Sequence, residues 1–211
     1  MDDVMFILEL IGAAAFAVSG AMVGIEKKAD VFGVLFLAIT TALGGGVIRD
    51  LLIGRIPPVM FTSYYYLLIS AAVALAVFID AYLRREKYKK HLDKLDAVNN
   101  IFDAIGLAVF TISGMNAAIP VSDNVILVLF VGMCTGVGGG MLRDIMTNTM
   151  PKVLRKRVYA VASLLGGGLY YAMLAAGVNQ LVSIGCGMLL VFALRLFATI
   201  YKWNLPAVDL E

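Results

Sequence analysis

Long apolar runs separated by short polar segments are the main pattern along this chain of 211 residues. Each run has about 20 residues, the length that an α-helix needs to cross the hydrocarbon core of a bilayer. To within a few residues, the runs are 5–24, 32–52, 61–82, 99–118, 124–146, 158–176 and 178–200. The pattern predicts an all-α, polytopic membrane protein with seven transmembrane helices, folded as a single transmembrane domain over residues 1–211.

Lysine and arginine are distributed unevenly among the segments between these runs. Thirteen of them follow the first, third, fifth and seventh runs, whereas Arg55 alone follows an even-numbered run. Since cytoplasmic loops are enriched in basic residues, this bias predicts a cytoplasmic C-terminus and an outer N-terminus. Acidic residues precede the first run and no small-residue cleavage pattern follows it, so we expect a retained span and no signal peptide.

The composition makes the lipid bilayer the main partner. The chain is 61% hydrophobic and 15% charged, with a mean hydropathy of +0.91, which is typical of polytopic membrane proteins and excludes an ordinary soluble domain. Cys134 and Cys186 both fall in apolar runs and are expected to be free thiols. The sequence shows no nucleophile–base set, phosphate loop, cofactor fingerprint or metal-ligand spacing, so we expect no enzyme activity, no cofactor, no resident metal and no nucleic-acid partner.

The chain contains an internal repeat with an offset of 94 residues and no gap. Between residues 9–57 and 103–151, 18 of 49 positions are identical, including an aligned Ser-Gly pair, a triple glycine, an Arg-Asp pair and a proline. Each copy, about 5–83 and about 99–176, holds three runs, and an odd number of spans inverts the second copy in the membrane. We therefore expect two inverted three-helix repeats related by a pseudo-two-fold axis in the membrane plane. The seventh run, about 178–200, has no counterpart and is expected to pack outside the six.

Three consecutive glycines stand at equivalent positions of the second and fifth runs. They are Gly44, Gly45 and Gly46 in the second run, and Gly138, Gly139 and Gly140 in the fifth. Glycine costs about 1 kcal/mol relative to alanine inside a helix, so each triplet predicts a kink or an unwound turn. Backbone groups freed there have to face protein or a water-filled cavity, because lipid cannot satisfy them. The alternative is close packing of two helices, which glycine also permits.

Arginine is the second unusual feature of these two runs. Arg49 and Arg143 each stand three residues after a glycine triplet. An arginine inside a span is costly and usually faces the bundle interior or a cavity, which predicts a charged pathway. The alternative is snorkelling of the long side chain to the membrane surface, and we expect snorkelling for Arg195 near the end of the seventh run.

Two pairs of acids accompany the two arginines. Asp50 and Asp144 follow them directly, but adjacent residues of a helix point in different directions, so these aspartates are not automatic partners. Glu9 and its repeat mate Asp103 lie on the first and fourth runs at about the depths of the two arginines. We therefore predict two symmetry-related ion pairs, Glu9 with Arg49 and Asp103 with Arg143, one near each end of the pathway. The alternative is that both acids only occupy a first helical turn, which favours negative charge.

Several hydroxyl groups could add polar surface to the same pathway. Ser19 and Ser113 occupy equivalent positions, each followed by glycine, and Thr40, Thr41 and Thr135 lie just before the glycine triplets. For the serines, the alternative is a hydrogen bond back to a carbonyl of their own helix.

The doubled GGGxxRD motif, the three-plus-three-plus-one arrangement of spans and the small size resemble the prokaryotic TRIC (trimeric intracellular cation) channel family. Bacterial members of that family are also catalogued under glycine transport. The resemblance covers essentially the whole chain and implies a homotrimer with one pore per protomer, which conducts K⁺ and Na⁺ and is lined by the kinked second and fifth helices. It also implies the plasma (inner) membrane of a bacterium or archaeon. Carried over by motif, the glycine triplets correspond to the kinks and Arg49 and Arg143 to basic residues on the pore side.

Three function classes follow from these observations. A cation channel fits the resemblance, provided that an acid neutralises each arginine, because a bare pore arginine repels cations and favours anions. A secondary transporter of a small solute such as glycine fits equally well with inverted repeats and broken helices, and an arginine could then hold the substrate carboxylate. A membrane protein without transport function is the third class, and the symmetric charges argue against it.

Overall fold

Ten helices and no strands make up the part of the chain that the structure, a computed structural model, describes: residues 2–90, 92–155, 158–201 and 203. Seven of the helices are long and apolar enough to cross a membrane, which confirms the predicted all-α fold with seven spans. In chain order the helices are α1 (Asp2–Glu26), α2 (Val31–Leu52), α3 (Val59–Thr62), α4 (Tyr64–Leu83), α5 (Arg85–Lys90), α6 (Leu92–Ala118), α7 (Val125–Met146), α8 (Lys152–Arg155), α9 (Val158–Ala175) and α10 (Gln180–Ile200).

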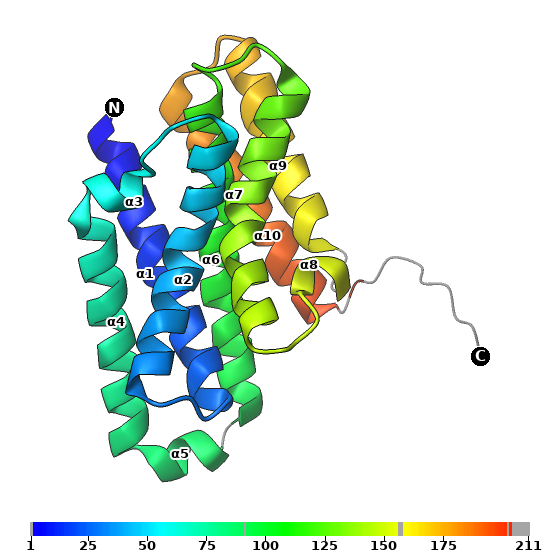
Figure 1. Cartoon of the computed structure of the whole chain (residues 1–211). Helices are drawn as coiled ribbons and strands as arrows, with labels where there is room; N and C mark the ends of the chain where they lie inside the picture. Colours follow the sequence, from blue (N-terminus) through cyan, green and yellow to red (C-terminus); the bar gives the residue numbers. More distant parts are fainter. Residues whose placement is uncertain (1, 91, 156–157, 202, 204–211) are drawn as a thin grey trace.

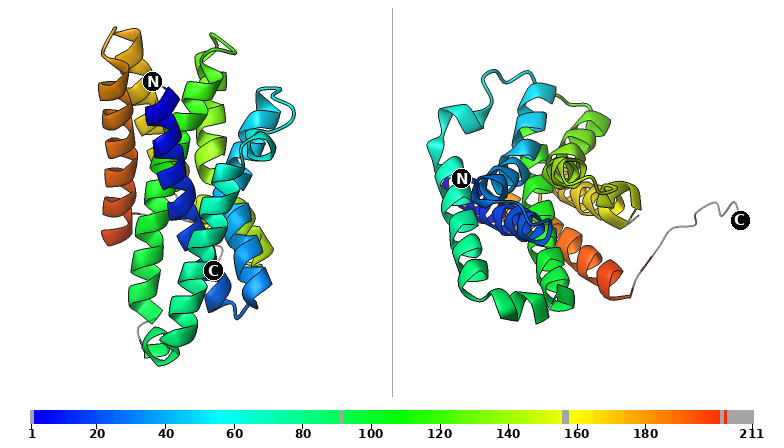
Figure 2. Two further views of the ribbon diagram at one scale, coloured as in Figure 1. Left: turned by 90° about the vertical axis from the view of Figure 1, so that its left-hand side faces the viewer. Right: turned by 60° about the horizontal axis from the view of Figure 1, so that its bottom comes forward.

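The long helices form one bundle in which successive spans run in opposite directions (Figure 1). One end of the bundle carries α3 and the connections from α6 to α7 and from α9 to α10, and we call it the α3 end. The opposite end, the α5 end, carries α5 and the connections from α1 to α2 and from α7 to α8. Helices α4 and α10 lie on opposite sides of the bundle (Figure 2).

The two copies of the repeat meet through equivalent helices. Helix α1 packs against α6, and α2 packs against α7, so the interface joins each element to its own repeat mate. Where α1 meets α6, the repeat mates Phe16 and Phe110 stack with ring centroids 5.4 Å apart. Two repeat mates can touch each other only near the pseudo-two-fold axis that relates them. The aromatic pair therefore marks this axis and the centre of the bundle. Helix α10 packs on α6 and α9, outside the six, as expected.

Short polar side chains explain where several spans begin. Asp30, Asn124 and Asn179 each accept a hydrogen bond from a backbone N–H of the first turn of α2, α7 and α10, which satisfies donors that the helix itself leaves unpaired. After α2 and α7 the chain turns through repeat mates with positive φ, Gly54 (72°) and Asn148 (51°). The symmetry of the repeat therefore extends to the turns.

Two boundaries differ from the sequence prediction. Helix α6 begins at Leu92, seven residues before the predicted span, because the charged segment after Leu92 continues the helix beyond the apolar stretch. The predicted third span is divided into α3 and α4 by Ser63, whose backbone is extended (φ −124°, ψ 104°). A hydropathy pattern marks where apolar residues begin and does not report where backbone hydrogen bonding begins.

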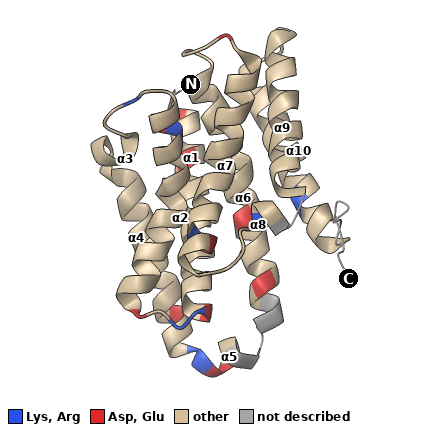
Figure 3. Ribbon diagram, turned by 45° about the vertical axis from the view of Figure 1, so that its right-hand side comes forward, with Lys and Arg blue, Asp and Glu red and all other residues tan. Residues whose placement is uncertain are grey.

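The outer surface of the bundle is apolar along most of its length. Phe32, Ile126 and Leu189 are 73%, 78% and 67% exposed, as expected for side chains that face lipid. Figure 3 shows charged residues gathered at the α5 end, with long stretches of helix that carry none. A few charges lie exposed in the connections at the α3 end, such as Arg55 and Asp123, and a few others are buried inside the bundle, where they form the candidate site.

Candidate functional site

The two glycine triplets mark the place where α2 crosses α7. Both helices remain α-helical through the triplets, so the predicted unwound turn is wrong for this structure. A Cβ atom built on Gly45 would collide with the carbonyl group of Thr135, and one built on Gly139 would collide with the carbonyl group of Thr41. Close packing, the alternative interpretation, therefore accounts for the central glycines, since only glycine lets two backbones approach this far.

This crossing leaves no room for an ion between the two helices. A methyl group already overlaps backbone atoms on both sides, and backbone atoms cannot rotate away as a side chain can. Thr41 and Thr135 donate their hydroxyl hydrogens to carbonyl groups of their own helices, Leu37 and Val131, at 2.6 Å. Thr40 is half-buried, and its side-chain hydroxyl forms no hydrogen bond among the described residues. The crossing is thus closed in this structure.

On the α3 side of the crossing, five residues form the Arg49 cluster: Glu9, Arg49, Asp50, Tyr66 and Ser113. Arg49 is 5% exposed. Its guanidinium group donates from Nη1 to Glu9 Oε1 at 3.2 Å and to Ser113 Oγ at 3.1 Å. Tyr66 donates to the other oxygen of Glu9 at 2.5 Å, and Ser113 donates to Oε1. The first predicted ion pair is therefore present, and Glu9 accepts three hydrogen bonds.

On the α5 side, the equivalent Arg143 cluster has Ser19, Asp103, Arg143 and Asp144 at its centre. Arg143 and Asp103 are both fully buried, and Arg143 Nη1 lies 2.8 Å from Asp103 Oδ1. The same nitrogen donates to Ser19 Oγ at 2.5 Å, and Ser19 donates to Asn99 Oδ1 at 2.6 Å. The second predicted ion pair is thus present too. Full burial excludes both snorkelling of Arg143 and a merely solvated first-turn position for Asp103.

Each arginine is held by residues of both repeats. Its carboxylate comes from its own copy, but its serine comes from the other: Ser113 of the second copy bonds Arg49, and Ser19 of the first copy bonds Arg143. Neither serine follows the alternative of bonding back to its own helix. Because α1 carries both Glu9 and Ser19, it touches both clusters, and α6 does the same through Asp103 and Ser113.

The aspartates of the Arg-Asp pairs are also partners of the arginines, which their adjacent positions on the helix alone did not predict. Arg49 Nε lies 2.8 Å from Asp50 Oδ1, and Arg143 Nε lies 2.9 Å from Asp144 Oδ1. The Cβ directions do differ, but the long arginine side chain curls back and closes the gap. The second oxygen of each aspartate accepts the first backbone N–H of a short helix, Val59 in α3 and Lys152 in α8, both at 2.8 Å.

The two copies differ by one residue in this last contact. The repeat mate of Lys152 is Pro58, which has no N–H to donate, so the bond in the first copy moves to Val59. The aspartates therefore fix the short helices at the two ends of the bundle.

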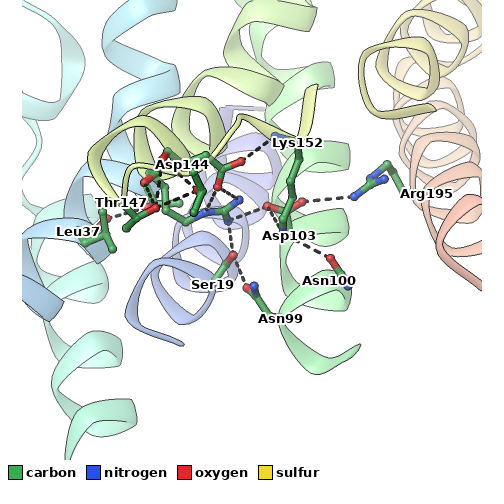
Figure 4. Close-up of polar contacts among 12 residues, drawn as sticks. Ser19, Leu37, Asn99, Asn100, Asp103, Asp144, Thr147, Lys152 and Arg195 are labelled. Atoms are coloured by element: carbon green, nitrogen blue, oxygen red, sulfur yellow. Dashed lines mark hydrogen bonds and ion pairs between the residues drawn. The ribbon is translucent and has the colours of Figure 1, made fainter. Parts of the chain in front are cut away.

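Three further residues join the Arg143 cluster, and sequence reasoning missed all of them. Arg195 of α10 is 2% exposed, so the prediction that it snorkels was wrong. Its guanidinium carbon lies 4.4 Å from the ring centroid of Tyr159, and its Nη2 lies 3.6 Å from Asp103 Oδ2. Lys152 Nζ lies 4.0 Å from Asp103 Oδ1 (Figure 4). Burial lowers the pKa of Lys152 to about 8, against the opposing pull of Asp103.

The two clusters consequently carry opposite net charge. The Arg49 cluster has one cation and two carboxylates, a net charge of −1. The Arg143 cluster has three cations, Arg143, Lys152 and Arg195, and the carboxylates of Asp103 and Asp144, a net charge of +1 when Lys152 is protonated. The only sign of these extra cations in the sequence was Arg195, an arginine inside the seventh apolar run. Because that run has no counterpart in the repeat, no symmetry argument could suggest which acid Arg195 contacts.

A small cavity adjoins the Arg49 cluster. It measures about 30 Å³ and is lined by residues of that cluster together with apolar residues such as Met60 and Phe110. This volume holds about two water molecules. Within the described part of the chain, no group of three or more His, Cys, Asp and Glu residues is placed to hold a metal ion. Cys134 and Cys186 are free thiols, as predicted.

Comparison with known proteins gives relatives along the whole chain. The family model described as "Glycine transporter" matches residues 6–81 and again residues 100–175, which are the two copies of the repeat. A UPF0126 membrane protein of Deinococcus radiodurans is 39% identical over 190 residues, covering 89% of this chain and 84% of the relative. A UPF0126 inner membrane protein of Escherichia coli strain K12 is 32% identical over 205 residues, covering 97% and 96%.

Solved structures with the same fold are named as TRIC channels. A prokaryotic TRIC channel crystallised in 0.5 M KCl has a TM-score of 0.87 at 33% identity, covering 97% of this chain and 100% of that one. A chain from a structure described as the basis for conductance through TRIC cation channels has a TM-score of 0.84 at 37% identity, covering 97% of both. A TRIC trimeric intracellular cation channel orthologue from Rhodobacter sphaeroides has a TM-score of 0.84 at 30% identity, covering 95% and 99%. The chain is therefore a multi-pass membrane protein, not an enzyme, and belongs to the prokaryotic TRIC family that the glycine-transporter model describes.

Proposed function

We propose that the protein is a channel for K⁺ and Na⁺, with one pore in each protomer of a homotrimer. The observation that carries this proposal is the pairing of each buried arginine with a carboxylate of its own repeat, Glu9 with Arg49 at 3.2 Å and Asp103 with Arg143 at 2.8 Å. A bare arginine in a pore repels cations, whereas a carboxylate partner neutralises the charge of that arginine. The net charge of +1 in the Arg143 cluster comes from the additional cations Lys152 and Arg195. The cation channels and the trimeric orthologue among the structural neighbours support the same function and assembly.

The proposed pore runs between α2 and α7 and passes both clusters. Glu9, Arg49, Asp103 and Arg143 are its charged constrictions, with Ser19 and Ser113 as polar lining and the threonines beside the crossing. Asp50 and Asp144 position α3 and α8 at its two mouths. Permeant ions are the only ligands that this function needs, and no cofactor is part of it.

Opening requires α2 and α7 to separate at their crossing, because backbone contact closes it here. We infer that the glycine triplets allow this by letting both helices kink away from each other, as glycine lowers the cost of bending. The Phe16–Phe110 stack lies at the same level on the pseudo-two-fold axis, so it has to part as well. By the distribution of lysine and arginine, the α5 end faces the cytoplasm.

Planar bilayers with a KCl gradient test this function. Purified protein should give unitary currents that reverse near the K⁺ equilibrium potential. Glu9→Gln should lower the cation preference, since it leaves Arg49 with Asp50 alone, while Ser70→Ala, a buried serine of α4 outside both clusters, should leave it unchanged. Absence of unitary currents in otherwise folded protein would reject the proposal.

Transport of glycine is the second candidate, and the name of the matching family favours it. Two charged sites related by an inverted repeat and separated by a closed contact also suit alternating access. In that mechanism Arg49 or Arg143 releases its carboxylate partner in the protein and binds the carboxylate of the substrate instead. Saturable counterflow of labelled glycine into proteoliposomes, without unitary currents, would establish this candidate in place of the channel.

A further inference from the structure

A second, larger cavity lies at the α5 end, away from the pathway between α2 and α7. Its volume is about 650 Å³, within the range of sites that hold small organic ligands. The walls come from the end of α1, the end of α4, helix α5 and the start of α6. Met22, Ile25, Phe78 and Leu95 supply apolar lining, and Asn99 lies at its inner side, so we call it the Asn99 cavity.

Four charged residues surround the mouth of this cavity, two acids and two bases. Glu26, Lys28, Arg85 and Asp96 all line it and all are exposed. None of them forms an ion pair with another residue that the structure describes. Among the lining residues that the structure describes, acids and bases are equal in number, a pattern that is complementary to a zwitterion.

The backbone at Lys28 adopts a conformation that glycine favours. Lys28 has a φ of +59°, a conformation that glycine adopts freely and other residues at a cost of about 1–2 kcal/mol. Its N–H bonds Ile25 O and the next N–H bonds Gly24 O, both at 3.0 Å, which is the usual end of a helix at glycine. A lysine in this position keeps an ammonium group at the mouth of the cavity despite the strain.

The opposite wall is held in place by contacts between α4 and α5. Arg84 forms an ion pair with Asp80 at 3.0 Å, and Tyr88 donates to the other oxygen of Asp80 at the same distance. Burial and this hydrogen bond raise the pKa of Tyr88, so its hydroxyl stays protonated and keeps the bond. Tyr82 and Tyr88 both line the cavity, and tyrosine is enriched where a span meets the headgroup layer.

The Asn99 cavity is connected to the Arg143 cluster by two hydrogen bonds. Asn99 Oδ1 accepts from Ser19 Oγ at 2.6 Å, and Ser19 Oγ accepts from Arg143 Nη1 at 2.5 Å (Figure 4). A ligand that displaces the Asn99 amide therefore changes the bonding of Arg143. Asn99 therefore links the lining of this cavity to the buried Arg143.

We propose that the Asn99 cavity binds an aminophospholipid, whose occupancy sets the state of the Arg143 cluster. Lys28 and Arg85 receive the phosphate, and Glu26 and Asp96 receive the primary ammonium group. An acyl chain lies along the apolar lining between α1 and α4. A lipid satisfies both the zwitterionic rim and the apolar interior at the end of three membrane spans, where a headgroup lies.

Native mass spectrometry of the intact, delipidated protein tests the binding. Titration with dioleoyl phosphatidylethanolamine should give at least tenfold tighter binding than the phosphatidylglycerol or phosphatidylcholine of the same chains, which lack a primary ammonium group. Lys28→Gly, which keeps and relaxes the turn, should weaken binding about tenfold, whereas Lys27→Gly beside it should not. Equal binding of phosphatidylglycerol, or unchanged binding by Lys28→Gly, would overturn the proposal.

Two further variants separate the two halves of the proposal. Glu26→Gln together with Asp96→Asn should remove the preference for phosphatidylethanolamine and leave weaker, unselective binding. Asn99→Leu should keep the binding and abolish the effect of this lipid on currents recorded in bilayers with and without it. A lipid effect that persists in Asn99→Leu would refute the link to Arg143. The binding measurement needs no current, so it does not depend on the channel function proposed above.

Discussion

The closed crossing of α2 and α7 makes opposite predictions for two adjacent glycines. A Cβ atom on Gly45 falls on the carbonyl group of Thr135, and the amide nitrogen of Gly139 is only 3.4 Å away. A Cβ atom on Gly46 meets nothing nearer than the Arg49 Nη2 atom at 4.0 Å. Alanine at either position makes the same chemical change in the same helix, so Gly46→Ala is a matched control for Gly45→Ala.

The magnitudes follow from two opposing contributions. Replacing glycine by alanine inside a helix gains about 1 kcal/mol, and that gain applies to both positions. Overpacking costs about 1–3 kcal/mol, with the upper part of that range expected where the obstacle is backbone, and that cost applies to Gly45 alone. Gly46→Ala should therefore raise the melting temperature by about 2–4 °C, while Gly45→Ala should lower it by about 2–8 °C.

The chain offers its own reporters for this measurement. Cys134 and Cys186 are free and half-buried in spans, so a thiol-reactive fluorophore labels them as the protein unfolds in detergent. Recording currents from the same variants gives a second readout, because Gly45→Ala forces α2 and α7 apart and should increase the open fraction. If Gly45→Ala melts at the same temperature as Gly46→Ala, the contact that closes the crossing does not exist in the protein.

The remaining predictions concern the charged clusters. Asp103→Asn leaves Arg143 buried beside two other cations and should cost about 3–5 kcal/mol of stability. Glu9→Gln should cost clearly less, because the carboxyl group of Glu9 is partly exposed. Equal melting temperatures of the two variants would contradict this ranking. Ser19→Ala removes a buried hydrogen bond to Arg143 and should cost about 1–3 kcal/mol by thermal unfolding, so a loss below 0.5 kcal/mol (about 1–2 °C) would rule out the bond. The Lys152 pKa of about 8 lies below its ordinary 10.5, so the unfolded chain holds more protons between these values and stability should rise with pH across that window. Loss of the same proton removes positive charge from the pathway, so K⁺ conductance should increase between pH 7 and 9 and stay flat in Lys152→Met.

The repeat explains why much of the site was visible in the sequence. Glu9 and Asp103 could be matched to the two arginines because a fixed offset places both pairs at corresponding depths, and one argument then predicts two contacts. The spans were equally accessible, since the bilayer imposes both their length and their apolar composition.

Other parts of the site depend on distances that no pattern contains. A glycine triplet is compatible with an unwound turn or with a close crossing, and only the position of the partner backbone at Thr41 and Thr135 decides between them. Arg195 was misjudged because its direction depends on how α10 rotates against α6 and α9. Lys152 looked like one of many basic residues in a loop, and its burial follows from the bond that draws α8 onto Asp144.

The Arg49 and Arg143 clusters carry net charges of opposite sign, so the electrostatic potential differs between the two ends of the proposed pathway. Moving one elementary charge across a potential of 100 mV changes its energy by about 2.3 kcal/mol. One net fixed charge acts on a passing cation on the same scale, since two unit charges 4 Å apart interact by about 4 kcal/mol at an effective dielectric constant of about 20. In the proposed pore, a cation that enters at the α3 end meets an attractive site first, whereas one that enters at the α5 end meets a repulsive one. Duplication supplied two similar clusters, and Arg195 and Lys152 make them unequal, so we expect the proposed pore to rectify.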